Sequence, residues 1–181
     1  MADDTRTRLI ESALALLRAG GLEAVTLRAV GDASGLSRSA AYRHFTDKTA
    51  LLAALAGRVV LDLSEQVSAA VGSTDDLPGR LRAFYQGYVD YAMRHPQEYR
   101  LVFASEFLAG SHPELEVAVD EVMDQLGLRV AGRPGAAKAD LLALLCTAHG
   151  LAELATAGHL THKGLDAADV IDAIVRNHQG R

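Results

Sequence analysis

Residues 26–51 read TLRAVGDASGLSRSAAYRHFTDKTAL. This stretch predicts two short helices joined by a tight turn. Leu27, Val30 and Ala33 recur at helical spacing and would give the first helix an inner face. Gly35 permits the sharp turn that must follow. Two short helices that meet at a steep angle across such a turn form a helix-turn-helix.

The second helix of this stretch combines a packing side with a hydrogen-bonding side. Ser37 is suited to cap its start, small Ala40 and Ala41 allow a close approach to the first helix, and Phe45 would anchor its far end. Six side chains of this segment can donate hydrogen bonds and none is acidic: Ser37, Arg38, Ser39, Tyr42, Arg43 and His44. Such a helix is typical of a reader of the DNA major groove.

Individual DNA contacts follow from side-chain length and position. Arg38 and Arg43 are long enough to reach guanine edges or phosphates. Phosphate contacts suit Thr26, Tyr42, His44 and Lys48, and two of these, Thr26 and Lys48, stand at helix N-termini, where backbone amides favour anions. Arg28 and Ser39 are equally compatible with DNA contact and with an ordinary surface position. The candidate DNA-binding residues are therefore Thr26, Arg28, Ser37, Arg38, Ser39, Tyr42, Arg43, His44 and Lys48.

The segment YRHFTDKTALL, preceded by Gly35-Leu36-Ser37, resembles the signature of the TetR/AcrR family of small-molecule-responsive regulators. The resemblance is close over residues 5–60 and beyond them covers only the order of helices. It implies that the second helix of the motif enters the major groove and that the amide end of the next helix lies on phosphate. It further implies double-stranded operator DNA and a small-molecule effector as partners, with repression as the commoner mode.

The rest of the chain continues the helical pattern. Before the motif, Leu9, Ala13, Leu16 and Leu17 recur at helical spacing and predict a helix that stops at Gly20-Gly21. Asp47 is suited to cap a long helix that ends before residues 72–76. Further helices are predicted over residues 77–94, 97–108, 114–130, 136–159 and 166–178, with loops at residues 132–135 and 161–164. The expected fold is all-α with about nine helices. We expect a helix-turn-helix domain over residues 1–48 and a helical effector-binding and dimerisation domain over residues 49–181.

Composition and charge agree with a cytoplasmic protein that binds a polyanion, if at all, through its N-terminal part. The formal net charge is −5. Residues 1–48 carry seven basic and six acidic side chains, whereas the remainder carries eleven and seventeen. The single cysteine, Cys146, cannot form an intramolecular disulfide and suits a reducing compartment. The N-terminus lacks the layout of a signal peptide, and the apolar stretch Leu141–Leu160 is interrupted by polar residues, so no membrane span is expected.

A stripe of small residues in the long C-terminal apolar helix suggests close packing with another helix. Ala148, Ala152 and Ala155 fall at i, i+4 and i+7. The partner helix can belong to the same chain or to a second copy. In proteins that resemble this family, the last two long helices form a four-helix bundle across a two-fold axis. A homodimer is expected, because one recognition helix covers too few base pairs for useful specificity.

Aromatic residues gather on two neighbouring helices of the C-terminal body. Phe84, Tyr88 and Tyr91 share one helical face, and Tyr99, Phe103 and Phe107 recur at helical spacing on the next helix. Such a stripe fits either an ordinary core or a pocket with a polar wall, which would house the tyrosine hydroxyls. We expect a modest, largely apolar effector to contact Tyr88, Tyr91, Phe103, Phe107 and His149.

An enzyme is not indicated by any motif of the chain. The sequence has no Gly-x-Gly-x-x-Gly, Gly-x-Ser-x-Gly or Cys-x-x-Cys. Cys146 and His149 stand at i, i+3, but without a further ligand of matching spacing we expect no metal and no cofactor, and Cys146 is expected to be a small core residue. The predicted function is a repressor that a small ligand releases from its operator. The alternative is a helical ligand- or metal-binding sensor that does not bind DNA.

Overall fold

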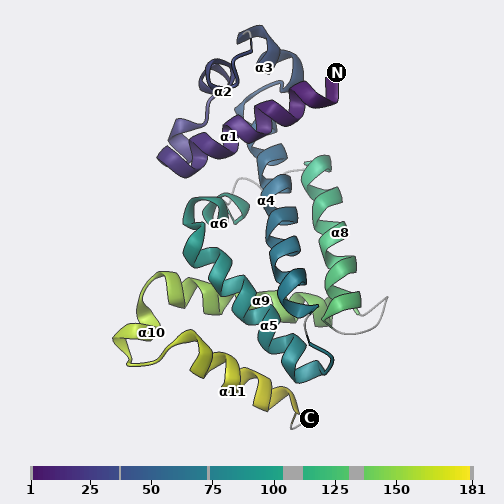
Figure 1. Ribbon diagram of the computed structural model, residues 1–181, viewed down its shortest axis with the longest axis vertical. Coiled ribbons are helices and arrows are strands. Elements are labelled where there is room, and N and C mark those ends of the chain that lie inside the picture. Colours follow the sequence, from purple (N-terminus) through teal and green to yellow (C-terminus); the bar gives the residue numbers. More distant parts are fainter. Residues whose placement is uncertain (1, 37, 73, 104–111, 131–136, 180–181) are drawn as a thin grey trace. The chain divides into compact units, whose positions relative to one another are not determined.

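The computed structural model describes residues 2–36, 38–72, 74–103, 112–130 and 137–179 (Figure 1). Over these ranges the chain forms ten helices and no strand, which confirms the all-α prediction. The helices are α1 (Ala2–Ala24), α2 (Leu27–Ala33), α3 (Arg38–His44), α4 (Lys48–Val71), α5 (Leu77–Arg94), α6 (Pro96–Val102), α8 (Pro113–Arg129), α9 (Lys138–Thr156), α10 (His159–His162) and α11 (Ala167–Gln179).

Two glycines change the predicted helix ends. The helix expected to run to His159 stops at Thr156, because Gly158 takes the left-handed conformation with φ of 73°. The short helix α10 follows at once, where the sequence predicted the start of a loop. In α1, Gly21 has φ of 68° and kinks the helix at the predicted stop, and helical structure resumes up to Ala24.

The chain folds into two compact units. The first contains Met1–Val60 and Gln97–Val119, and the second contains Leu61–Pro96 and Asp120–Arg181. Both α4 and α8 contribute to both units. These compact units do not test the expected division of function between residues 1–48 and 49–181, which stays a prediction.

The first unit has a core built on α1, which also holds a buried carboxylate of α6 in an ion pair. Leu9, Ala13 and Leu17 are buried at i, i+4 and i+8 along α1. On the same helix, Arg18 donates from Nε to Oε1 of Glu98 at 2.6 Å and from Nη2 to Oε2 at 3.3 Å. Glu98 is only 1% exposed, and a buried carboxylate is tolerated only when it is paired in this way. The pair therefore fixes α6 on α1.

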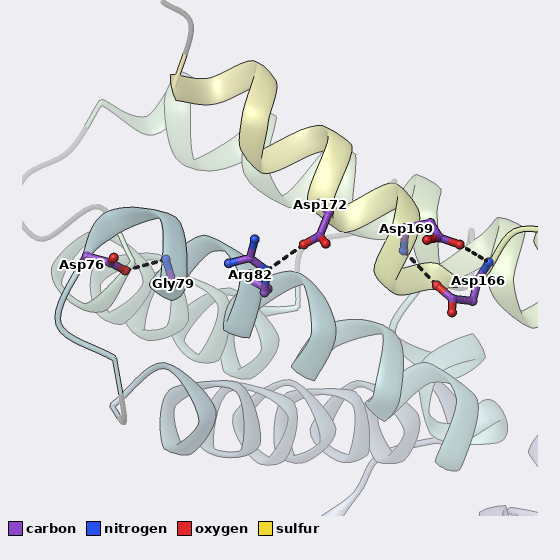
Figure 2. A network of polar contacts seen from close by, with 6 residues as sticks. All are labelled: Asp76, Gly79, Arg82, Asp166, Asp169 and Asp172. Atoms are coloured by element: carbon purple, nitrogen blue, oxygen red, sulfur yellow. Dashed lines mark hydrogen bonds and ion pairs between the residues drawn. The ribbon is translucent and has the colours of Figure 1, made fainter.

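The second unit is organised around α5. This helix packs against both α9 and α11 (Figure 1), and α11 contributes buried Ile171 and Val175 at i, i+4. Figure 2 shows the ion pair between Arg82 of α5 and Asp172 of α11, with Nε 2.7 Å from Oδ1. The same view shows reciprocal capping at the start of α11, because the Asp169 amide donates to Asp166 Oδ1 at 2.8 Å and the Asp166 amide to Asp169 Oδ2 at 3.2 Å.

Helix α9 is covered on one side only. By length and composition alone it could cross a membrane, a test that core helices of soluble proteins also pass, and 28% of its apolar window is buried. The sequence predicted a buried helix here. In the single chain, however, an apolar part of this helix is exposed, including Leu142 and Leu154.

Candidate nucleic-acid interface

The predicted helix-turn-helix is formed by α2 and α3. The Thr26 Oγ1 accepts a hydrogen bond from the Ala29 amide at 3.1 Å and caps α2 as expected. Gly35 has φ of 67°, in the left-handed region, and makes the sharp turn. Ser34 is buried beside it, donates from Oγ to the Gly31 carbonyl at 2.9 Å and thereby closes the end of α2.

One member of the predicted inner face of α2 is wrong. Leu27 and Val30 are buried, but Ala33 is exposed. The face continues instead through Gly31 and Ser34, because positions i, i+3, i+4 and i+7 share one side of a helix and i+6 does not.

The second helix of the motif, α3, presents a polar face to solvent. Ala40, Ala41 and Phe45 are buried, as the sequence predicted. Opposite them, Ser39, Tyr42 and Arg43 are exposed, with Tyr42 at 59%, and His44 is half-buried. Ser39, Tyr42 and Arg43 stand at i, i+3 and i+4, so the helix brings three of the predicted DNA-contact residues together on one side. Ser37 and the side chain of Arg38 lie outside what the structure describes.

Two arginines of α1 contact the helix-turn-helix. Arg8 donates from Nη2 to the Ser34 carbonyl at 2.9 Å, which fixes the turn between the two helices. Arg6 stacks on the ring of Phe45, with its guanidinium carbon 5.3 Å from the ring centroid, and also pairs with Glu114. These arginines therefore hold α3 in place.

Lys48 has a structural contact that the sequence did not reveal. Its ammonium donates to the Leu22 carbonyl at 3.2 Å, and the side chain is half-buried. The kink at Gly21 lies one residue before that carbonyl. An ammonium carries three protons, so this bond leaves others for a phosphate. The prediction that Lys48 contacts phosphate therefore stands beside a role in joining α4 to α1.

The other expected phosphate and surface contacts lie at the N-terminal end of α2. Thr26 is exposed, and its hydroxyl proton is not used by the cap, in which its oxygen is the acceptor. Arg28 is exposed and lies 3.9 Å from Asp32 in a long i, i+4 ion pair. A contact of this kind between exposed groups is weak, so the guanidinium can turn to another anion.

The five predicted effector-contact residues do not form one described group. Tyr88, Tyr91 and His149 belong to the second unit, where the two tyrosines are buried and His149 is half-buried. Phe103 belongs to the first unit, and Phe107 lies outside the described residues. Their joint role as an effector site stays a prediction.

A different tyrosine is the most deeply buried of the aromatic group. Tyr85 of α5 is completely buried, and burial raises the pKa of its hydroxyl. Tyr85 was not part of the aromatic face predicted for this helix. The spacing of aromatic residues did not predict this burial, because α5 is covered on more than one side. Gly87 and Val89 are buried for the same reason.

Two alanines of the small-residue stripe of α9 pack within the chain, whereas the cysteine of this helix is not where the sequence predicted it. Ala148 and Ala152 are fully buried within the chain, so they pack on neighbouring helices of the same subunit. Cys146 is exposed, not a core residue. Over the described residues, no group of three or more His, Cys, Asp or Glu side chains is arranged to hold a metal ion.

Comparison with known proteins matches both parts of the chain to related domain families. Residues 9–55 match the family of bacterial regulatory proteins called the tetR family, and residues 81–178 match the tetracyclin repressor-like C-terminal domain. Together with the predicted signature in residues 26–51, these matches cover both the helix-turn-helix and the C-terminal body.

Two curated relatives and two solved structures illustrate the similarity. The chain is 29% identical over 117 residues to the HTH-type transcriptional activator FasR of Mycolicibacterium smegmatis, covering 65% of this chain and 53% of FasR. It is 30% identical over 127 residues to the HTH-type transcriptional repressor KstR of Mycobacterium tuberculosis, covering 66% and 56%. The chain therefore spans about half the length of the curated relatives it matches.

Among solved structures, a protein of unknown function from Rhodococcus sp. RHA1 is similar with a TM-score of 0.76 and 28% identity, covering 96% of this chain and 92% of that one. A TetR-family transcriptional regulator from Streptomyces coelicolor gives a TM-score of 0.69 and 21% identity, covering 100% and 98%. The second likeness concerns the fold alone.

Proposed function

Because this chain belongs to the tetR family of bacterial regulatory proteins, we propose that it regulates transcription by binding operator DNA as a homodimer. The observation that carries this proposal is the exposed face of α3, where Ser39, Tyr42 and Arg43 stand together on a helix without acidic residues. Groups that donate hydrogen bonds suit both base edges and phosphate oxygens.

The proposed docking places α3 in the major groove. Arg43 and Arg38 are the candidates for guanine contacts, and Ser39 lies one turn from Arg43. Thr26, Tyr42, His44 and Lys48 would hold the flanking phosphates, assisted by the amide ends of α2 and α4. Arg28 and Ser37 complete the set of candidate contacts. Residues 1–48 supply all of these groups, and residues 49–181 would carry effector binding and dimerisation.

The proposed dimer interface uses α9 and α11. Regulators of this family form dimers, and an apolar stripe on α9 supports this location. Leu142 and Leu154 are 57% and 47% exposed, and they continue at i, i+4 spacing through exposed Cys146 and Gly150. A Cβ added at Gly150 would meet no atom within 4 Å, so another helix can approach closely there. Single large apolar residues are common on surfaces, but a continuous stripe favours a partner.

The proposed regulation is repression that a small, largely apolar ligand relieves. One curated relative is named as an activator and the other as a repressor, and repression is the commoner mode implied by the family resemblance. The ligand must bind the two DNA-affinity states differently in order to shift them. We propose a cytoplasmic protein that acts by binding, without catalysis.

An electrophoretic mobility shift assay on DNA flanking the coding locus tests this function. The purified chain should bind with an affinity that falls steeply with salt, because phosphate contacts release counterions. Arg43→Ala should weaken the specific shift, because a contact to a base edge is lost. Arg129→Ala, which removes an exposed arginine from α8, is the matched control and should bind as the wild type does. Absence of any specific shift by the wild-type dimer would leave the non-DNA sensor as the better function.

A further inference from the structure

One buried hydroxyl in the second unit has no hydrogen-bond partner among the residues that the structure describes. It belongs to Tyr85, whose side chain is 0% exposed in the middle of α5. The ring packs against Phe84 in an edge-on arrangement, with centroids 5.1 Å apart. Buried polar atoms in folded proteins are nearly always paired, because an unpaired one destabilises the fold. Packing alone therefore does not explain a tyrosine at this position, where phenylalanine would fit.

Thr147 of α9 does not resolve this unpaired hydroxyl. Burial raises the pKa of Tyr85, and the Thr147 hydroxyl opposes that effect, so the two groups are near each other. Their geometry is nevertheless not that of a hydrogen bond. The one proton of Thr147 is donated to the Ala143 carbonyl at 2.9 Å. Thr147 therefore has no proton left for the tyrosine oxygen, and the geometry is not that of a hydrogen bond from the tyrosine to the Thr147 oxygen either.

The buried side chains of α5 and α9, two helices that pack against each other, are mostly apolar. They include Leu81, Phe84, Leu141, Ala148 and Leu151. The cations of the two helices are placed elsewhere. Arg82 pairs with Asp172, and Arg80 donates to the Val130 carbonyl at 3.4 Å. Arg94 donates to the Asp90 carbonyl at 3.2 Å, and Lys138 stands at the start of α9. A charged ligand group beside Tyr85 would find no opposite charge from these side chains, and burying it would be costly.

We propose that the Tyr85 hydroxyl is the polar anchor of a ligand site between α5 and α9, where it donates a hydrogen bond to the carbonyl oxygen of an uncharged, largely apolar molecule. This inference rests on the proposed function, because it names a residue and a ligand class for the effector site of that regulator. The phenol is protonated at physiological pH, because its pKa lies above the ordinary 10.0, so it acts as a donor. A ketone, ester or lactone supplies the missing acceptor without adding a charge.

Thermal unfolding of the ligand-free protein tests the first half of the proposal. Tyr85→Phe removes only the unpaired hydroxyl, so Tm should rise by about 2–4 °C. Tyr99→Phe is the matched control, because Tyr99 is a buried tyrosine of the other unit whose hydroxyl is not a buried unpaired atom. Its Tm should not rise. A lower Tm in Tyr85→Phe would mean that the chain itself satisfies this hydroxyl, and the proposal would be overturned.

Ligand titration with octan-2-one and octanoate tests the second half. Octan-2-one at millimolar concentration should raise the Tm of the wild type and of Thr147→Val, and bind Tyr85→Phe about tenfold more weakly because the hydrogen bond is lost. Octanoate, which carries a charge, should give no comparable shift. The proposal fails if octan-2-one has no effect on the wild type, if it acts equally on Tyr85→Phe, or if octanoate is the better ligand.

Mobility shifts with the same proteins separate this proposal from the proposed function. Wild type, Tyr85→Phe and Thr147→Val should bind operator DNA equally without ligand, and octan-2-one should weaken binding by the wild type more than by Tyr85→Phe. If no variant binds DNA while the thermal results hold, the ligand site stands and the regulatory function fails. If DNA binding is intact and the thermal results are negative, only the Tyr85 site is refuted.

Discussion

The helices α3 and α9 are both amphipathic, yet they differ in what their outer sides offer. The outer side of α3 carries Ser39, Tyr42 and Arg43, which are polar and hydrogen-bonding. The outer side of α9 carries Leu142 and Leu154, which are apolar. A polar outer side is stable in water and remains available to an anion, whereas an apolar one is stabilised by a protein partner. The contrast separates the surface proposed for DNA from the surface proposed for a second copy.

The largest effect is expected inside α9, at a position that the sequence alone would have assigned to the interface. Ala152 is 0% exposed, so Ala152→Arg forces an unpaired charge into the packed interior of the subunit. Such a charge costs about 3–5 kcal/mol, a large part of the stability of a typical domain. We expect loss of the cooperative thermal transition and of soluble protein, rather than a folded monomer.

Leu154→Arg tests the outer side of the same helix. Leu154 is 47% exposed in the single chain, so the variant should keep its helical circular dichroism and thermal transition. Analytical ultracentrifugation at micromolar concentration should show monomers where the wild type is dimeric. A folded monomer from Ala152→Arg, together with a normal dimer from Leu154→Arg, would reverse the assignment of the two sides. A monomeric wild type would remove the dimer altogether.

The next effect concerns the polar side of α3. Arg43→Ala should weaken specific operator binding by about 1–3 kcal/mol, since a bidentate contact to guanine is lost. Competition against operators substituted at single base pairs should show relaxed discrimination at one position in each half-site. Uniform weakening on every sequence would instead assign Arg43 to phosphate.

A smaller effect is expected at the proposed phosphate contacts. Tyr42→Phe and Lys48→Ala should weaken binding uniformly across sequences, and Lys48→Ala should reduce the slope of log affinity against log salt by about 1. Lys48→Ala should also lower the free energy of unfolding by about 0.5–1.5 kcal/mol, because its bond to the Leu22 carbonyl is lost. Tyr42→Phe, at an exposed position, is the control for stability. Unchanged DNA affinity in both variants would contradict the phosphate assignment.

The helix-turn-helix could be predicted because its signals are local. The caps by Thr26 and by Asp47, whose Oδ1 accepts from the Ala50 amide at 2.8 Å, act within three residues, and the turn depends on the backbone of Gly35. Such signals are complete within a short stretch of sequence. Ala33 was misplaced only because the inner face of a two-turn helix is defined by few positions.

The body could be predicted less well, because periodicity defines a helical face but not the neighbour that covers it. The alanines of α9 were correctly grouped, yet Ala148 and Ala152 turn toward the same chain. The ion pair between Arg18 and Glu98 joins residues 80 positions apart, and no short-range sequence pattern predicts it. Tyr85 was overlooked for the same reason, since α5 is covered on several sides.

The smallest effect is a change in alkaline stability that depends on how completely Tyr85 is buried. Burial raises the pKa of Tyr85 above its ordinary value of 10.0. The unfolded chain therefore releases this proton at a lower pH than the folded chain does. The contribution to stability is fully present below pH 10 and is lost as the pH rises through the higher folded-state pKa, by at most about 1.4 kcal/mol for each pH unit.

Urea unfolding between pH 9 and pH 11 measures this effect. The free energy of unfolding of the wild type should fall faster with pH than that of Tyr85→Phe. Tyr42→Phe should follow the wild type, because it leaves the buried phenol in place. Parallel pH profiles for the wild type and Tyr85→Phe would show that water reaches this hydroxyl in solution. The packing beneath α9 would then not exclude water, and it would no longer differ in this respect from the exposed face of α3.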